Sequence, residues 1–394
     1  MAASTHKNIE FNSKYGYLIH QFSQAGSNSG GSGIVRKTMY AVIMAGGKGT
    51  RFWPRSRGKK PKHLLKIFSG KSILRETVDR IKALVPEENI YVVTGRGHAN
   101  EVSRQIPEIP SAHLLVEPVG RNTAPCIGLA ALHVFKTDPE GVMAVFPSDH
   151  FIRHEKEFIR ILSIASQIAE RRGALVTVGV TPTGPETGYG YVEKGDILTR
   201  LKKEDIYRAK SFREKPDLRK AKAFIRSGRF LWNSGIFLWK ASTILDTIKV
   251  FLPELHEGLL EIEEALDTRR EKDVLKKVYR RIKPVSIDYG VMEKSREVLL
   301  VRGDFGWSDV GNWDALWELL EKDEEGNVII GQGMAVDSRK SLVYSPDKLV
   351  ALIDVEDIIV VETKDSVLIC KRGLSQDVRK IVDILEKQKL RKYL

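Results

Sequence analysis

The sequence has few cysteines and no long apolar run, and both shortages limit what the protein can be. Its two cysteines among 394 residues, Cys126 and Cys370, are far apart, so they offer neither a disulfide framework nor a metal-binding cluster. This cysteine usage is typical of reducing compartments, so we expect a cytoplasmic protein. No apolar segment reaches the roughly 18 residues of a membrane span, and neither end resembles a signal peptide, so we expect no membrane partner.

Other chemistries lack their usual sequence signatures. The histidines are scattered, and no Ser/His/Asp or Cys/His arrangement is readable, so covalent catalysis has no support. The net charge is +13, but no basic run is interleaved with aromatic residues and no zinc-finger spacing occurs. We therefore expect no nucleic-acid partner. The positive excess fits a solvated basic surface, and it would also steer a phosphorylated substrate toward the protein.

The composition changes twice along the chain, which predicts three parts. Residues 1–38 end in a Gly/Ser-rich stretch and are expected to be a flexible N-terminal extension outside the functional part. Residues 39–325 alternate apolar strands with helical patterns, which is typical of an α/β domain with a Rossmann-like, mixed and mostly parallel sheet. Residues 326–394 contain short β runs and end in a helix, which predicts a small partial β-helix domain. We assign its basic tail to packing or oligomerisation and expect a homodimer.

The most informative stretch lies at the start of the α/β part. The apolar run 40–44 predicts a buried strand, and Gly46, Gly47 and Gly49 follow it. Glycines let the backbone turn sharply, and successive N–H groups in such a turn bind phosphate, to which Arg51 adds positive charge. The spacing fits neither the dinucleotide fingerprint nor the P-loop. The stretch is therefore either a cradle for a nucleoside triphosphate or a tight turn with no ligand.

Two aspartates are candidate metal ligands. Asp149 follows an apolar strand, and Asp309 lies in a stretch rich in glycine and tryptophan. Each could instead be structural, as a helix cap or as part of a turn. Mg²⁺ that binds together with a nucleotide commonly uses one or two carboxylates, phosphate oxygens and waters. Asp149 and Asp309 together would meet that need.

A charged motif and two further polar residues could bind a sugar phosphate. Arg213, Glu214 and Lys215 precede a proline, which favours an extended Lys215 and would put Arg213 and Lys215 on one side with Glu214 opposite. Lys215 could then hold a phosphate while Glu214 accepts hydrogen bonds from a sugar, although a solvated charge run is the alternative. Asn233 and Asp288 could bind sugar hydroxyls or could satisfy buried backbone groups.

The motifs, taken in order, resemble those of the sugar-nucleotide pyrophosphorylases, specifically the mannose-1-phosphate guanylyltransferases, over about residues 39–320. They are AGGKGTRFWP at 45–54 with PK at 61–62, RNTAP at 121–125, PSDH at 147–150, ETGYGY at 186–191, FREKP at 212–216, WNSG at 232–235, SIDYGVMEK at 286–294 and WSDVG at 307–311. His63 stands where many relatives have Gln, and Arg213 where many have Val. Longer relatives carry a fused isomerase domain, and the length of this chain predicts a single activity.

The resemblance implies an enzyme that transfers GMP from GTP to α-D-mannose 1-phosphate and gives GDP-mannose and pyrophosphate, with Mg²⁺ as cofactor. The sugar phosphate would attack the α-phosphorus in line, assisted by metal, and would need no general base because its oxygen is already nucleophilic. One alternative is another hexose-1-phosphate nucleotidylyltransferase. Another is a non-catalytic homologue that binds nucleotide-sugars and regulates a partner, which the intact phosphate loop and both aspartates disfavour.

The resemblance also implies residue roles. The catalytic residues would be Arg51, Lys62, Asp149 and Asp309, and the two aspartates would bind the metal. The nucleotide-binding residues would be Ala45, Gly46, Gly47, Gly49, Thr50, Arg51, Asn122, Thr123, Ala124 and Pro125. The residues around the sugar phosphate would be Glu186, Gly188, Tyr189, Gly190, Glu214, Lys215, Asn233 and Asp288.

Overall fold

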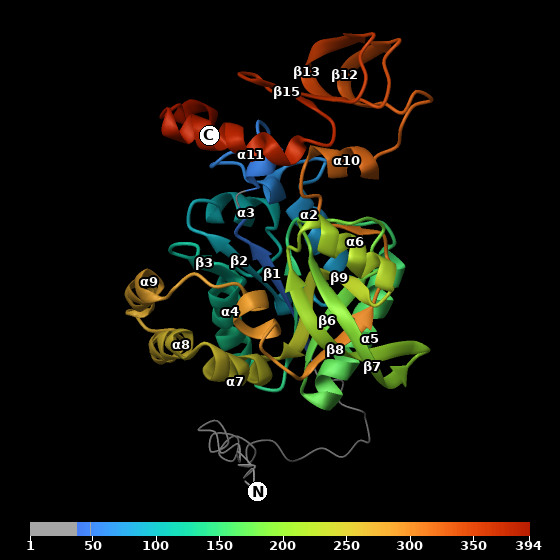
Figure 1. Cartoon of the computed structure of the whole chain (residues 1–394). Coiled ribbons are helices and arrows are strands. Elements are labelled where there is room, and N and C mark those ends of the chain that lie inside the picture. The colour runs from blue at the N-terminus through green and yellow to red at the C-terminus, as the bar shows by residue number, and fades with distance from the viewer. Residues whose placement is uncertain (1–37, 48) are drawn as a thin grey trace, which may run out of the picture. The chain divides into compact units, whose positions relative to one another are not determined.

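The structure, a computed structural model, describes residues 38–47 and 49–394 (Figure 1). The extension expected over residues 1–38 lies outside the described residues except for Thr38, and so does Lys48. The strands are β1 (Met39–Ala45), β2 (Ile90–Gly95), β3 (Leu114–Glu117), β4 (Val142–Pro147), β5 (Phe151–Ile152), β6 (Leu175–Val180), β7 (Gly190–Leu201), β8 (Glu204–Glu214), β9 (Phe230–Lys240), β10 (Val298–Arg302), β11 (Trp307–Ser308), β12 (Val328–Val336), β13 (Leu342–Ile353), β14 (Ile358–Glu362) and β15 (Val367–Lys371).

Helices connect most of these strands. The α-helices are α2 (Ile73–Ile81), α3 (Ala99–Gln105), α4 (Thr123–Thr137), α5 (Glu155–Arg172), α6 (Leu218–Ser227), α7 (Ala241–Phe251), α8 (Pro253–Ala265), α9 (Glu271–Arg281), α10 (Trp313–Leu319) and α11 (Val378–Lys387). The short helical turns are η1 (Thr50–Phe52), η2 (Lys62–Leu64), η3 (Glu87–Asn89), η4 (Ser111–His113), η5 (Asp288–Met292), η6 (Ser375–Asp377) and η7 (Arg391–Tyr393).

A mixed sheet dominates the first part of the described chain. Its nine strands there have the order β3-β2-β1-β4-β9-β6-β10-β8-β7. The strands β3, β2, β1 and β4 are parallel neighbours, whereas β9 lies antiparallel between β4 and β6. The expected α/β fold with a mixed sheet is thus confirmed. In such a sheet the loops after parallel strands meet at one edge, where ligands bind.

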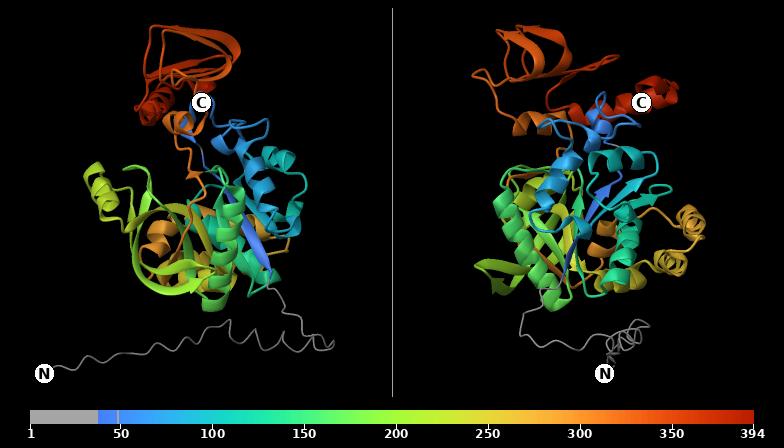
Figure 2. Two further views of the ribbon diagram at one scale, coloured as in Figure 1. Left: turned by 90° about the vertical axis from the view of Figure 1, so that its right-hand side faces the viewer. Right: turned by 180° about the vertical axis from the view of Figure 1, so that it is seen from behind.

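Both faces of the sheet are buried, as the side chains of β1 show. Ala41, Ile43 and Ala45 face a core formed with α2, α3 and α5, whereas Tyr40 and Val42 face a second core formed with α4, α7 and α8. Successive side chains of a strand point to opposite faces, so a run of apolar residues needs cover on both. The helices therefore form one layer on each face of the sheet (Figure 2).

The C-terminal part is a smaller β domain that packs on the loop after β1. Its strands have the order β12-β13-β14-β15, and α11 follows them, which confirms the expected small all-β domain that ends in a helix. Phe52 and Trp53 share a third core with Trp313 of α10 and with Val378 and Val382 of α11. The segment that follows the glycine stretch is therefore held by residues from the other end of the chain.

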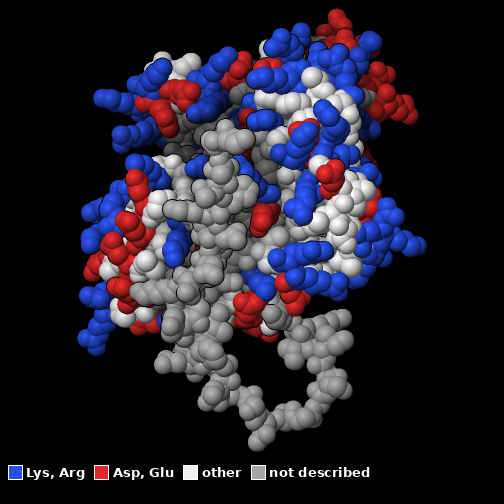
Figure 3. Space-filling view, turned by 60° about the horizontal axis from the view of Figure 1, so that its bottom comes forward, with Lys and Arg blue, Asp and Glu red and all other residues white. Residues whose placement is uncertain are grey.

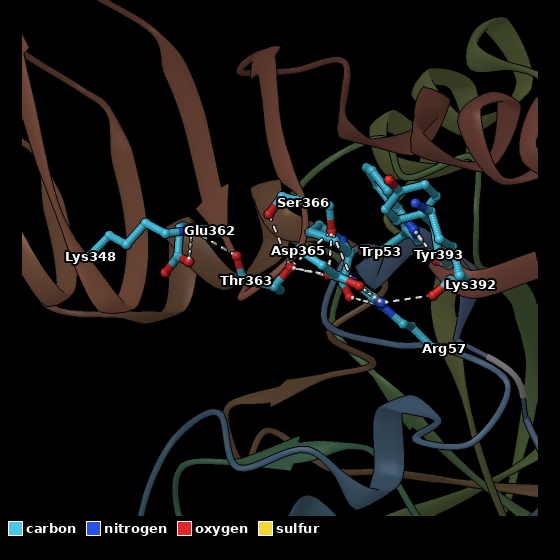
Figure 4. Close-up of polar contacts among 10 residues, drawn as sticks. Trp53, Arg57, Lys348, Glu362, Thr363, Asp365, Ser366, Lys392 and Tyr393 are labelled. Atoms are coloured by element: carbon cyan, nitrogen blue, oxygen red, sulfur yellow. Dashed lines mark hydrogen bonds and ion pairs between the residues drawn. The ribbon is translucent and has the colours of Figure 1, made fainter. Parts of the chain in front are cut away.

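Polar contacts reinforce this packing, and Arg57 makes most of them (Figure 4). Its guanidinium donates to both carboxylate oxygens of Asp365, one at 2.8 Å, and to Ser366 Oγ at 2.8 Å, both residues lying in the turn before β15. The indole of Trp53 donates to the carbonyl of Tyr393 at 2.8 Å. The pKa of Asp365 is held well below its usual range by the hydrogen bonds from Arg57.

The surface carries charges of both signs. On the face that Figure 3 shows, acidic side chains lie among the more numerous basic ones. Within the described part of the chain, the helices are all too short or too polar to cross a membrane.

We expect Arg57→Ala to loosen the attachment of the C-terminal domain. The guanidinium side chain is only 21% exposed, but Asp365 is 44% exposed, so we expect a loss of about 1 kcal/mol in the free energy of unfolding. Because the depressed pKa of Asp365 stabilises the fold above its unfolded value and this contribution disappears in acid, the difference from wild type should shrink as the pH falls below about 4. Urea unfolding followed by tryptophan fluorescence measures this. Lys364→Ala, at an exposed neighbour, is the control, and an equal loss in both variants would contradict the prediction.

Candidate functional site

The glycine stretch after β1 lies at the carboxyl edge of the parallel strands. Gly49 has a φ of +62°, and a Cβ there would collide with the Cβ of Lys62. Only glycine tolerates both the left-handed backbone and this close approach. The hydroxyl of Ser56 donates to the carbonyl of Gly49 and holds the turn. Gly47, by contrast, is exposed and has open space where a Cβ would be.

Lys62 joins the two aspartates. Its ammonium lies 2.9 Å from a carboxylate oxygen of Asp149 and donates to the backbone carbonyl of Asp309. Lys62 is only 4% exposed, so its charge needs these partners. Burial alone would raise the pKa of Asp149, but the charge of Lys62 and the neighbouring His150 lower it to about 2. Asp149 is therefore ionised at neutral pH.

A short strand pair explains why residues 160 positions apart converge. β5 and β11 are antiparallel, with Ser308 opposite Phe151. Asp149 lies two residues before β5 and Asp309 directly follows β11, so both carboxylates lie at the same end of the pair. His150 is fixed there as well, because its Nδ1 accepts a hydrogen bond from the indole of Trp307 at 3.1 Å.

The carboxylate of Asp309 faces the cavities of the site. Its Oδ1 accepts a hydrogen bond from the hydroxyl of Tyr189 at 2.8 Å. A Cβ at Gly311 would lie 3.0 Å from its Oδ2, so the glycine leaves room around this oxygen. Burial and the charge of Asp309 raise the pKa of Tyr189, which therefore remains a donor. Tyr189 packs edge-on against Trp232 and Trp307, with ring centroids 5.0 and 5.1 Å away.

One cavity of about 190 Å³ collects most of the residues expected to surround a sugar phosphate. Gly190 of β7 pairs with Glu214 of β8 on one side and with Asn233 of β9 on the other. A Cβ at Gly190 would collide with the Glu214 carboxylate, so any other residue there would displace that carboxylate. Asn233 donates to Asp288 Oδ1 at 2.8 Å. Burial and the nearby Glu214 raise the pKa of Asp288 to about 6.

The prediction of an extended backbone at Lys215 is wrong. Strand β8 ends at Glu214, and Lys215 has a φ of +46° in the left-handed region rather than the extended conformation that the following proline favours. The N–H of Lys215 donates to the carbonyl of Tyr189 at 3.2 Å, which fixes this turn. The ammonium consequently returns to the Glu214 carboxylate instead of pointing away from it. The charged groups of Lys215 and Glu214 therefore lie together instead of on opposite sides of the chain.

A second cavity, of about 320 Å³, adjoins the first. The two share Gly188, Tyr189 and Asp309, and the second also contains Arg51 and Glu186. Burial and the charge of Asp309 raise the pKa of Glu186. The structure thus brings Arg51, predicted to bind the triphosphate, and most of the predicted sugar residues to neighbouring cavities.

The other residues expected to bind the nucleotide are only partly accessible. Thr123 lines the first cavity, and its hydroxyl accepts a hydrogen bond from the N–H of Ile287 at 2.8 Å. Asn122 caps α4 by accepting from the N–H of Thr123. Ala124 and Pro125 are buried in the first turn of α4. Thr50 starts η1, and Ala45 ends β1 with no exposure.

Sequence reasoning missed two residues, Glu117 and Gln376. Glu117 ends β3 at the same sheet edge, is 4% exposed, and its Oε1 has no hydrogen-bond partner among the described residues. Burial raises its pKa to about 7, against an opposing contribution from the Tyr279 side chain. A Cβ on Gly46 would lie 3.8 Å from its Oε2. A carboxylate directly after an apolar strand was a usable signal for Glu117, whereas Gln376 carried none.

Two carboxylates form a minimal set of protein ligands for a metal. No cluster of three or more His, Cys, Asp or Glu side chains suited to a metal occurs among residues 38–47 and 49–394. Asp149 and Asp309 offer hard oxygen ligands, which suit Mg²⁺ when phosphate oxygens and waters complete its shell. The ammonium of Lys62, held between the two residues, indicates that their surroundings stabilise positive charge.

Comparison with known proteins identifies the class. The family model described as nucleotidyl transferase matches residues 40–326, and a model for the MannoseP isomerase/GMP-like beta-helix domain matches residues 331–385. The chain belongs to the nucleotidyl transferase family. It is 39% identical to the mannose-1-phosphate guanylyltransferase of Klebsiella pneumoniae, over 89% of this chain and 75% of that protein.

Further relatives agree with this placement among the mannose-1-phosphate guanylyltransferases. A protein of that name from Escherichia coli is also 39% identical, over 89% of this chain and 75% of its own length. A solved structure from Thermus thermophilus, described as a mannose-1-phosphate geranyltransferase, has 36% identity and a TM-score of 0.80, covering 89% of this chain and 99% of that one.

Proposed function

We propose that this protein is an enzyme that transfers GMP from GTP to α-D-mannose 1-phosphate, giving GDP-mannose and pyrophosphate. The observation that carries the proposal is the junction of the two cavities. Asp309 lines both cavities there, with Glu214 and other polar side chains in the first and Arg51 in the second. Lys62 links Asp309 to the carboxylate of Asp149. The relatives that match most of the chain are named for this activity.

The reaction needs no base from the protein, because a phosphate monoester oxygen is already an anion at neutral pH. That oxygen forms a bond to the α-phosphorus of GTP, the bond from the α-phosphorus to the bridging oxygen breaks, and pyrophosphate leaves with its electrons. The backbone N–H groups of Gly46 and Gly47 would hold the triphosphate, and Arg51 and Lys62 would neutralise its charge. Catalysis is then mainly positioning of the two substrates.

We assign a Mg²⁺ site to Asp149 and Asp309. When bound, the metal would supply additional charge neutralisation on the phosphates. Tyr189 would keep Asp309 oriented through its hydrogen bond, and Lys62 would keep Asp149 ionised at neutral pH. We also propose that the protein is cytoplasmic and forms a homodimer. Light scattering on the purified protein tests the oligomeric state.

We assign the sugar to the first cavity and the base to the region of Glu117. Glu214 and Asn233 offer acceptors and donors for sugar hydroxyls, and Lys215 lies beside them for the sugar phosphate. Glu117 lies next to Gly46, and its Oε1 has no hydrogen-bond partner among the described residues. When ionised, this carboxylate suits the two adjacent N–H donors that guanine has and adenine lacks. Asn122 caps α4 and Thr123 to Pro125 form its first turn, where the helix dipole favours negative charge.

The direct test measures pyrophosphate release by the purified chain with GTP, mannose 1-phosphate and Mg²⁺. We expect release that requires all three, and the highest kcat/KM for this pair when four nucleoside triphosphates and several hexose 1-phosphates are compared. A preference for another nucleotide or hexose would reassign the substrate. No release from any pair would remove the enzymatic proposal.

Lys215→Ala should raise the KM for mannose 1-phosphate at least tenfold, because the variant loses a charge-assisted contact to phosphate. The KM for GTP should change little. Initial rates at varied sugar phosphate measure both, and Arg213→Ala, an exposed residue of the same motif, serves as control. An unchanged KM in Lys215→Ala would return the motif to a solvated surface role.

Asp149→Asn and Asp309→Asn should each lower kcat by roughly 100-fold while changing the affinity for mannose 1-phosphate less. The amide keeps the side-chain shape and removes the charge that a metal needs. Steady-state kinetics at varied Mg²⁺ is the measurement, and thermal unfolding separates the effect from loss of folding, since Asp149→Asn leaves Lys62 with fewer partners. Asp196→Asn, at an exposed position, is the control. Small, equal effects on kcat and binding would contradict the assignment.

Glu117→Gln should weaken the preference for guanine. An amide can accept only one of the two guanine hydrogen bonds and presents an N–H to the other donor, so kcat/KM for GTP should fall roughly 10- to 100-fold. The fall should be smaller for ITP, which lacks the 2-amino group. The ratio of kcat/KM for GTP and ITP is the readout, with the exposed Glu88→Gln as control. An unchanged ratio would place the base elsewhere.

A further inference from the structure

The C-terminal β domain contributes Arg372, Gly373 and Gln376 to the lining of the second cavity, the one that contains Arg51. Gln376, in η6, accepts a hydrogen bond at its Oε1 from the guanidinium Nη1 of Arg51 at 2.9 Å. Its Nε2 lies beside the loop before β7, because a Cβ on Gly188 would be 3.9 Å from it. Gln376 thus contacts the residue expected to bind triphosphate and adjoins a glycine that lines both cavities.

The backbone of η6 is fixed from α10, only a few residues after Asp309. The carboxylate of Asp314 accepts hydrogen bonds from the N–H groups of Gly373 at 2.6 Å and Ser375 at 3.1 Å, and from the Ser375 hydroxyl. The N–H of Asp314 donates back to that hydroxyl at 3.0 Å. Ser375 is fully buried, so the position from which the Gln376 side chain extends is rigid.

Several carboxylates lie in the same cavity as Arg51, so it matters that the hydrogen-bond acceptor of its guanidinium is uncharged. The cavity that contains Arg51 is also lined by the carboxylates of Glu186, Asp309, Asp314 and Glu318. A guanidinium paired with a carboxylate would lose much of its attraction for a phosphate. Among the described residues, the Arg51 guanidinium donates to one side chain, that of Gln376. The acceptor is an uncharged amide oxygen rather than a carboxylate.

We propose that Gln376 is a positioning residue that holds Arg51 in place for the triphosphate without neutralising it. The C-terminal β domain then completes the nucleotide site in addition to stabilising the fold. This inference rests on the proposed function, because it takes Arg51 to bind the phosphates of GTP.

The experiment compares Gln376→Glu, Gln376→Ala and the control Gln388→Glu, which adds the same charge at an exposed position of the C-terminal segment. The Kd for GTP is measured by calorimetry without sugar phosphate, and the KM values by pyrophosphate release. We expect Gln376→Glu to raise the Kd and KM for GTP roughly tenfold, because its carboxylate pairs with Arg51 and repels the triphosphate. Gln376→Ala should raise them less. The KM for mannose 1-phosphate and all constants of Gln388→Glu should stay near wild type.

A merely structural role gives the opposite order, because glutamate keeps the shape and the acceptor whereas alanine loses both. The proposal would therefore be overturned if the Kd for GTP stayed near wild type in Gln376→Glu but rose in Gln376→Ala. In an Arg51→Ala background, Gln376→Ala should cause no further rise in the Kd, and an additive rise would also overturn it. If the wild-type chain binds GTP but releases no pyrophosphate, the proposed function fails while the binding order still decides the role of Gln376. Absence of GTP binding by wild type would overturn both.

Discussion

A single buried ammonium group, that of Lys62, determines how the site is assembled. It pairs with the carboxylate of Asp149 and with the carbonyl of Asp309, and the backbone of Gly49 packs directly against its side chain. Three distant stretches of the chain thus meet at one positive charge. Lys62 is buried whereas the Asp149 side chain is 32% exposed, so removing Asp149 leaves an uncompensated buried positive charge. The glycine turn, the aspartates and the lysine therefore depend on one another, and a substitution at one of them affects the positions of the others.

The sugar cavity depends on strand register in a comparable way. Gly190, Glu214 and Asn233 come from β7, β8 and β9, and β7 pairs with both of the other strands. A shift of one residue in this pairing would turn a side chain to the other face of the sheet. The absence of a side chain at Gly190 creates the space that its two neighbours occupy. Recognition of a small polar ligand here would follow from sheet geometry rather than from a mobile loop.

Much of this organisation could be predicted from sequence because it depends on local patterns. Apolar runs followed by polar residues marked the strand ends, and the motif order indicated the family, which the comparisons confirm. The turn at Lys215 could not be predicted, since a hydrogen bond to Tyr189 overrides the preference set by its proline. The antiparallel insertion of β9 and the contact between Arg51 and Gln376 also escaped prediction. Both depend on long-range packing, which a single sequence does not encode in any short motif.

The third core has a consequence for how the molecule is made. Phe52 and Trp53 leave the ribosome early, but their partners Val378 and Val382 are synthesised more than 300 residues later. Until α11 is synthesised, these two aromatic side chains lack part of their cover, and exposed apolar groups of this kind make a partly folded chain prone to aggregation. A chain truncated before α11 would lack this cover permanently. Completion of the third core thus couples the packing of the segment after the glycine stretch to the synthesis of α11.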